Sequence, residues 1–189
     1  MAAETRVIFR DQRYENTLTI AGAHTYAIGD VIAGAANSIF TFGSSAAVMN
    51  SPAAPFSFDD SVLRSNAESV ARGVSLNAYR IVTSSATVAF AGEIWFFSKN
   101  MAVTDDSPLS ISFADMRDYF LGHVEFLSTD WKATGSGLIL SKDDVGKVLT
   151  FPDPQNYSTV TGQLFGVIVT RSAVSFVGAE SISGTIFVS

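Results

Sequence analysis

Short runs of β-forming residues, each closed by a breaker, dominate this 189-residue chain and restrict what it can fold into. The runs are rich in Val, Ile, Phe, Tyr and Thr, and Gly, Ser, Asp, Asn or Pro separate them. This pattern is typical of strands joined by turns. The candidate strands span residues 5–9, 16–20, 26–33, 38–42, 74–84, 89–97, 121–126, 137–140, 147–151, 163–170 and 182–188.

The periodicity within these runs distinguishes two kinds of strand. Residues 74–81 place apolar side chains mostly at even positions, which puts them on one face of a sheet. Residues 93–97, apart from Glu93, and residues 164–169 are apolar throughout, as in central strands buried on both faces. We therefore expect the core to be built from the strands at 74–82, 91–97, 163–170 and 182–188.

One segment has the pattern of a helix. Ser112 with Asp115 three residues later forms a candidate N-cap, and Gly122 is a candidate stop. Three apolar residues then share one helical face: Phe113, Met116 and Phe120. At about two turns this helix needs packing against the rest of the molecule to be stable.

Many short strands, long turns and one helix predict an all-β protein. We expect a β-sandwich or jelly roll with one short helix near residues 112–120 and an N-terminal arm. A closed barrel that carries a ligand is the main alternative. The length suits one domain, so we divide the chain into an arm, residues 1–14, and a single β-sandwich domain, residues 15–189.

Charge and composition exclude several classes of function. The net charge is −6, and the 12 Lys and Arg are scattered, with a loose cluster only at Arg6, Arg10 and Arg13. We therefore expect no binding to nucleic acid and none to an anionic membrane. No apolar stretch is long enough for a membrane helix, and the first residues are polar. These features predict a protein that is made in a cytoplasm and stays soluble.

The supply of chemically active side chains is small. The chain has no Cys and two His, His24 and His123, which we expect to be structural or surface residues. Three pairs of adjacent carboxylates lie beside breakers, where Asp accepts backbone hydrogen bonds in turns: Asp59 and Asp60, Asp105 and Asp106, Asp143 and Asp144. We therefore predict no catalytic residues, no metal site and no cofactor.

The features that point to binding are more distinctive. The segment around residues 5–14 mixes cationic, aromatic and apolar side chains, a combination favoured at protein interfaces. Its candidate contact residues are Arg6, Phe9, Arg10, Arg13 and Tyr14. The loop at residues 44–60 adds Phe56 and Phe58. Each set has a second interpretation. Residues 5–14 are then an ordinary first strand with solvated Arg, and Phe56 and Phe58 cover one end of the core.

Several segments, in order, resemble a group of tailed-phage head proteins. The first is Tyr26-Ala27-Ile28-Gly29-Asp30-Val31-Ile32, and the second is Ala91-Gly92-Glu93-Ile94-Trp95-Phe96-Phe97. The others are the acidic stretch at residues 104–109, the segment 113–124, and Gly162-Gln163-Leu164-Phe165-Gly166-Val167-Ile168-Val169. The resemblance covers roughly residues 20–188. The insertion at residues 44–60 has no counterpart in this pattern.

Some members of that group are capsid decoration, or cement, proteins. The resemblance implies a trimeric β-sandwich or jelly roll that sits on the outer face of the capsid and braces the major capsid protein. It implies neither catalysis nor a cofactor. We therefore expect a virion structural protein that is synthesised in the host cytoplasm and docks on the capsid as a homotrimer.

Two alternatives remain. The first is that the chain is another virion part of the same all-β build, a head fibre or a tail component. A carbohydrate-binding β-sandwich would instead present a Trp on a flat face. Trp131 is the better candidate for that role because it follows Asp130 among polar residues, whereas Trp95 lies in an apolar run and is expected in the core.

Overall fold

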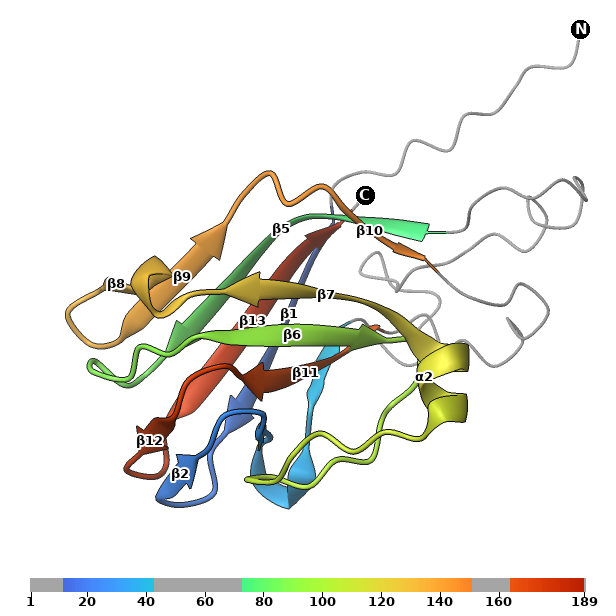
Figure 1. Ribbon diagram of the computed structural model, residues 1–189. Helices are drawn as coiled ribbons and strands as arrows, with labels where there is room; N and C mark the ends of the chain where they lie inside the picture. The colour runs from blue at the N-terminus through green and yellow to red at the C-terminus, as the bar shows by residue number, and fades with distance from the viewer. Residues whose placement is uncertain (1–11, 43–72, 151–163, 189) are drawn as a thin grey trace, which may run out of the picture.

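The computed structural model describes residues 12–42, 73–150 and 164–188, and all structural statements concern these residues. The expected strand at residues 5–9 and the loop at residues 44–60 lie outside them. The prediction of an all-β fold is confirmed. The strands form antiparallel sheets that pack together as a β-sandwich (Figure 1). In the described part of the chain, no helix has the length and apolarity needed to cross a bilayer.

The strands are short, as expected from the spacing of the breakers. They are β1 (Gln12–Thr19), β2 (His24–Tyr26), β3 (Val31–Ile32), β4 (Phe40–Phe42), β5 (Gly73–Thr83), β6 (Gly92–Phe97), β7 (Phe120–Phe126), β8 (Lys132–Ala133), β9 (Leu138–Lys142), β10 (Lys147–Thr150), β11 (Leu164–Thr170), β12 (Val174–Phe176) and β13 (Ser181–Val188). The helical elements are η1 (Ala35–Asn37), α2 (Phe113–Tyr119) and η3 (Ser128–Asp130).

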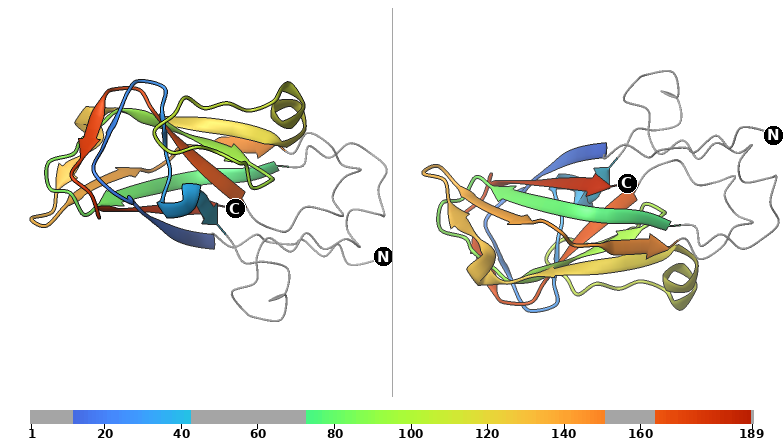
Figure 2. Two further views of the ribbon diagram at one scale, coloured as in Figure 1. Left: turned by 90° about the horizontal axis from the view of Figure 1, so that it is seen from below. Right: turned by 90° about the horizontal axis from the view of Figure 1, so that it is seen from above.

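Two sheets make up the sandwich. Sheet I has the order β1-β13-β5-β9-β8, and β10 also pairs with β5. Sheet II has the order β3-β11-β6-β7, and β4 also pairs with β11. A small third sheet joins β2 to β12. Seen from the side, sheets I and II lie one above the other (Figure 2).

The space between the sheets is filled largely by aromatic rings. The fully buried aromatic side chains of this core include Tyr26, Tyr79, Phe40, Phe42, Phe90, Phe96, Phe126 and Phe176. Phe40 of sheet II lies against Gly184 of β13, where an added Cβ would stand 3.0 Å from the Phe40 ring. This glycine therefore makes room for a ring from the opposite sheet. The four strands predicted to build the core supply much of it.

The alternation in β5 changes phase within the strand. Leu76 faces the core from an even position, but Tyr79 and Ile81 do so from odd positions. The pairing with β13 explains the change, because Ala78 pairs with Phe187 and Leu76 with Val188, so that one residue of β5 is skipped. Such a bulge moves the inward side chains to the other parity. The predicted run of even inward positions was wrong beyond the bulge.

Sheet II is buried on both faces. Alternate residues of β11 divide between two apolar clusters, with Ile168 in the core between the sheets and Val167 and Val169 in a second cluster on the outer face. Residues 98–112, here called the strap, cover this outer face together with α2. Side chains of these segments that pack into the second cluster include Met101, Val103, Leu109, Ile111 and Met116. This cover accounts for the continuously apolar pattern of β11.

Asp105 fastens the strap to the edge of sheet II. Its carboxylate accepts hydrogen bonds from the Tyr26 hydroxyl at 3.0 Å and from the Ala33 backbone N–H at 2.8 Å. Burial, followed by the charge of Asp105, raises the pKa of Tyr26 far above its ordinary value. The Val31 N–H also donates to the Ser107 carbonyl at 2.9 Å. These bonds hold the strap across the ends of β2 and β3.

Helix α2 begins where the sequence predicts. The Ser112 hydroxyl oxygen accepts a hydrogen bond from the Asp115 N–H at 3.0 Å, which confirms the N-cap. The expected apolar face was wrong at Phe113, which is 83% exposed. The predicted stop at Gly122 was also wrong, because the chain becomes extended at Phe120 and pairs with Phe97 there. Gly122 instead lies inside β7 at an irregular step of the pairing.

Two predicted boundaries also shift. The expected strand at residues 26–33 is interrupted, because Gly29 has a φ of 95° and β3 begins only at Val31. Strand β1 begins within the predicted arm: Gln12, Arg13 and Tyr14 pair with β13. An arm as predicted is therefore limited to residues 1–11, which lie outside the described residues.

Candidate functional site

A hydrogen-bond network on the outer face of sheet II holds the side chains of Trp95 and Arg171 in place. Glu93 of β6 is only 8% exposed. Its carboxylate accepts from Arg171 Nε at 2.6 Å, from Arg171 Nη2 at 2.5 Å and from the Trp95 indole N–H at 2.5 Å. A buried carboxylate requires such partners, and the paired Arg neutralises its charge. Glu93 therefore fixes both the guanidinium and the indole.

The ionisation of Glu93 reflects this balance. Burial raises the pKa of the carboxyl, but the hydrogen bonds from Arg171 and Trp95, together with the Arg171 charge, lower it overall. The bidentate contact with Glu93 also raises the pKa of Arg171. Both side chains are therefore charged near neutral pH, and their pairing is retained.

A pocket of about 430 Å³ lies between this network and the strap. We call it the strap pocket; it is lined by Gly29, Trp95, Pro108, Leu109, Ile111, Met116, Val169 and Arg171. Its walls are therefore mainly apolar, with one guanidinium. The Arg171 side chain is 43% exposed, so its free N–H groups are accessible to a ligand. Such a combination suits a ligand with an apolar body and an acceptor group.

His123 extends the aromatic part of this face. It lies opposite Trp95 in the pairing of β6 with β7, and the two rings stack with centroids 5.7 Å apart. One ligand atom each of Glu93, His123 and Glu125 lie within 4.8 Å of one another, a spacing that a metal ion requires. However, a cation there would compete with Arg171 for the Glu93 carboxylate. We therefore interpret Glu93 and His123 as parts of the hydrogen-bond and stacking network, with the exposed Glu125 carboxylate 3.6 Å from His123.

A second hollow of about 430 Å³ borders His123. It is lined by Tyr79, His123, Val124, Glu125, Lys142, Asp143, Val145 and Lys147. Its charges are mixed, and the hydroxyl of the lining residue Tyr79 donates to the Glu125 carbonyl at 2.7 Å. This polar hollow lacks the apolar walls and the fixed guanidinium of the strap pocket.

The exposure of the two Trp is the reverse of what the sequence predicts. Trp131 is buried, and its indole N–H donates to the Phe90 carbonyl at 2.7 Å, so the expectation of a flat exposed Trp131 was wrong. Trp95 lies on the outer face of sheet II and is only partly buried. Alternation within β6 gives Trp95 the opposite parity to the core residue Phe96, but it does not predict exposure, because Phe97 has the same parity as Trp95 and is fully buried.

Few of the predicted contact residues can be placed. Arg6, Phe9, Arg10, Phe56 and Phe58 lie outside the described residues. Arg13 is exposed on β1 and forms an ion pair with Glu15 at 2.5 Å. Tyr14 packs against the core, and this burial raises its pKa. The structure therefore separates these two neighbours, with Arg13 facing solvent and Tyr14 facing the sandwich.

The second His lies at the strap. His24 is within 3.8 Å of Asp105 and 3.6 Å of Asp106, at the point where the strap crosses β2. Asp105 and Asp106 lie in a turn, as predicted, and Asp105 also accepts backbone and Tyr hydrogen bonds there. Asp144 lies in the β9–β10 connection with a φ of 56°. Asp59 and Asp60 lie outside the described residues.

Comparisons with known proteins add no assignment to this geometry. No family model matches the chain, and no curated protein matches it significantly.

Proposed function

We propose that this chain is a non-enzymatic structural protein of a phage virion that decorates and stabilises the outer surface of the capsid. The major capsid protein is its partner. A protein of this kind acts as cement, because many identical weak contacts on a lattice add by multivalency and binding stabilises the assembled particle.

One observation carries the proposal. The segments that resemble phage head proteins come together in a single part of the molecule, sheet II and its strap. The first segment runs from Tyr26, the last residue of β2, through β3 at the edge of sheet II, the second contains β6, and the last contains β11. The acidic stretch at residues 104–109 lies in the strap and is bonded to the first segment through Asp105 and Tyr26. Because these segments lie together in the fold, they support the resemblance to phage head proteins more strongly than each segment does alone.

A homotrimer is part of the proposal. The chain is poor in charge, at 16% Asp, Glu, Lys and Arg, and assembly is one way for such a chain to cover surface. Residues 1–11 carry Arg6, Phe9 and Arg10 ahead of β1, which makes them the candidate contact with a neighbouring subunit. Because β1 pairs with β13 from Gln12 onward, the arm to be deleted ends at residue 11.

Co-sedimentation with capsid shells that lack the chain tests the proposal. The full-length protein should sediment with the shells and should have the mass of a trimer by light scattering. Deletion of residues 1–11 should leave the circular dichroism of the sandwich intact and should abolish the trimer. A full-length monomer that stays in the supernatant with shells present would refute the proposal.

Carbohydrate binding is the second candidate, and the position of Trp95 favours it. A partly exposed indole beside Arg171 offers a flat ring and fixed donors, which is what a sugar needs. A glycan array separates the two candidates. Glycan binding that is lost in Trp95→Ala, with no sedimentation on shells, would favour this alternative over capsid decoration.

A further inference from the structure

We infer that the strap pocket and its two exposed rims form the surface that docks on the capsid. The occupant is a segment of the capsid protein that presents an apolar side chain next to a carboxylate. This inference rests on the proposed function and adds to it the face that docks and the chemistry of the partner.

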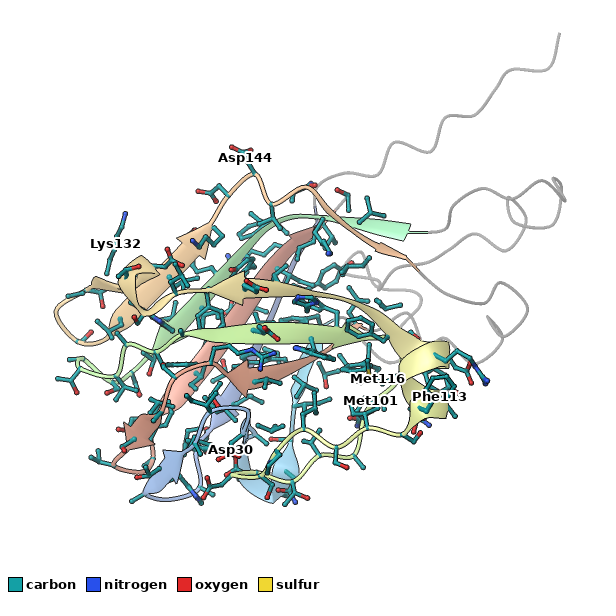
Figure 3. All side chains as sticks on the ribbon, viewed as in Figure 1. Asp30, Met101, Phe113, Met116, Lys132 and Asp144 are labelled. Atoms are coloured by element: carbon teal, nitrogen blue, oxygen red, sulfur yellow. The ribbon has the colours of Figure 1, made fainter. Side chains whose placement is uncertain are left out.

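The rims of the pocket carry large apolar side chains that the fold leaves in solvent. Ile28, next to the pocket residue Gly29, is 67% exposed. Phe113, one helical turn before the pocket residue Met116, is 83% exposed. Figure 3 shows Phe113 and Met116 on α2, with Met101 of the strap beside them. Ile28 and Phe113 each lie close in sequence to a residue that lines an apolar hollow, so they add exposed apolar surface beside it, and exposed apolar patches mark interaction sites.

The pocket contains the residue types that dominate protein interfaces. Trp, Met, Phe and Arg are enriched at protein interfaces, and Trp and Arg are among the residue types that most often provide the binding energy there. Trp95, Met116 and Arg171 line the pocket, and Phe113 borders it. Glu93 holds Trp95 and Arg171 in fixed positions through three hydrogen bonds. A partner therefore meets side chains that are already ordered, which lowers the entropic cost of binding.

The hydrogen-bond donors of the pocket define the polar part of the occupant. Arg171 is the one ionisable residue among those that line it. Glu93 uses Nε–H and one Nη2–H of the guanidinium, and its remaining N–H groups are left for another acceptor. Because Glu93 already balances the Arg171 charge, these remaining N–H groups act as hydrogen-bond donors, and a carboxylate matches their planar geometry. Leu109, Ile111 and Val169 then surround the apolar side chain beside that carboxylate.

Substitutions at the rims test the inference without touching the core. Ile28→Asp, Phe113→Asp and the double variant place charge on exposed positions, so the fold and the trimer should be retained. Val148→Asp is the matched control, because Val148 is an apolar residue on β10 of sheet I and is 55% exposed. In co-sedimentation with capsid shells, we expect the double variant to bind at least about tenfold more weakly than the wild type. The control should bind within about twofold of it.

Footprinting gives a second readout that does not depend on weakened binding. The chain has no Cys, so a single introduced thiol can be labelled selectively with a maleimide. Ala114 is exposed on α2. The Ala114→Cys thiol should be labelled in free protein and protected on shells, whereas the Val148→Cys thiol should be labelled in both.

The outcomes separate the inference from the function. Wild-type protein that binds shells, with rim variants that bind equally well and an unprotected Ala114→Cys, would overturn the docking face and leave capsid decoration standing. Loss of binding in Val148→Asp alone would assign docking to sheet I and overturn the inference. Wild-type protein that does not bind the shells, or that binds glycans instead, would refute both the docking face and capsid decoration.

Discussion

The outer faces of the two sheets differ although both sheets share one core. The outer face of sheet II lies under the strap, and Phe97 there is fully buried. The outer face of sheet I carries half-buried and polar side chains. Phe187 lies there with the Arg80 guanidinium 5.9 Å from its ring centroid, and the Thr17 and Ser183 hydroxyls are hydrogen-bonded at 2.6 Å.

The difference shows how a cover changes the sequence that a sheet requires. β11 is buried at every position and is apolar along its length, apart from a glycine and its last Thr. β13 alternates, with Ile182 and Ile186 inward and Ser183 and Phe187 outward. In a strand that packs on both faces, the outward positions are apolar as well as the inward ones, so the alternation of polar and apolar residues disappears. The comparison therefore predicts that equivalent outward residues contribute unequally to stability.

The largest expected effect concerns the buried Phe residues of sheet II, compared with Phe187 on the outer face of sheet I. Phe96→Ala and Phe97→Ala remove neighbouring rings from opposite faces of sheet II, and both are fully buried. Each should lower the free energy of unfolding by about 3–5 kcal/mol. Phe187→Ala on the outer face of sheet I should cost about 1 kcal/mol. Urea denaturation measures all three. Similar costs at Phe97 and Phe187 would contradict the difference between the faces.

The Glu93 network should contribute the next largest effect. Glu93→Gln weakens charged hydrogen bonds to Arg171 and should lower the free energy of unfolding by about 1.5–3 kcal/mol near neutral pH. Glu125→Gln is the control on the same face, since the Glu125 side chain is 69% exposed, and it should be nearly neutral.

This effect should depend on pH. Because the folded-state pKa of Glu93 is lowered, its contribution is present above the ordinary Glu pKa of about 4.3 and is lost as the pH falls through the folded value. The difference between wild type and Glu93→Gln should therefore shrink below about pH 4.3. A difference that stays constant down to pH 2 would contradict the pairing.

Gly184 tests the contact between the sheets. Gly184→Val introduces a side chain against the Phe40 ring and should cost about 1–3 kcal/mol by overpacking. Ser183→Val, one residue earlier and on the outer face, should change the free energy of unfolding by only about 0.5 kcal/mol. Thermal unfolding of both variants gives the comparison. Equal costs would mean that Phe40 moves aside freely.

The smallest effect is expected at Arg80 on the outer face of sheet I. Its buried Nε has no hydrogen-bond partner, which offsets the attraction between its guanidinium and Phe187. Arg80→Met keeps the length of the side chain and should leave the free energy of unfolding within about 0.5 kcal/mol of wild type. A loss of about 2 kcal/mol would show that the guanidinium has a partner that matters.

Local patterns were sufficient for most of the strands and for the start of the helix. β-branched and aromatic runs located most strands, and the apolar run of residues 164–169 indicated burial on both faces. Ser112 and Asp115 located the start of α2, because an N-cap is formed by residues close in sequence. Short pieces such as β8 and β12 were missed. Two or three residues carry too little periodicity, and these strands depend on their partners β9 and β2.

The candidate site depended on contacts that no local pattern contains. Glu93, Trp95 and Arg171 meet because β6 pairs with β11, which brings residues 78 positions apart within hydrogen-bond distance. The sequence by itself determined an all-β chain with a Phe-rich core and little acid–base chemistry. Only the tertiary structure decided which Trp is exposed, because that choice depends on which face of a strand is covered and by which segment. Period-two alternation specifies that neighbouring side chains point to opposite faces, whereas the strap and the opposing sheet decide what each face meets.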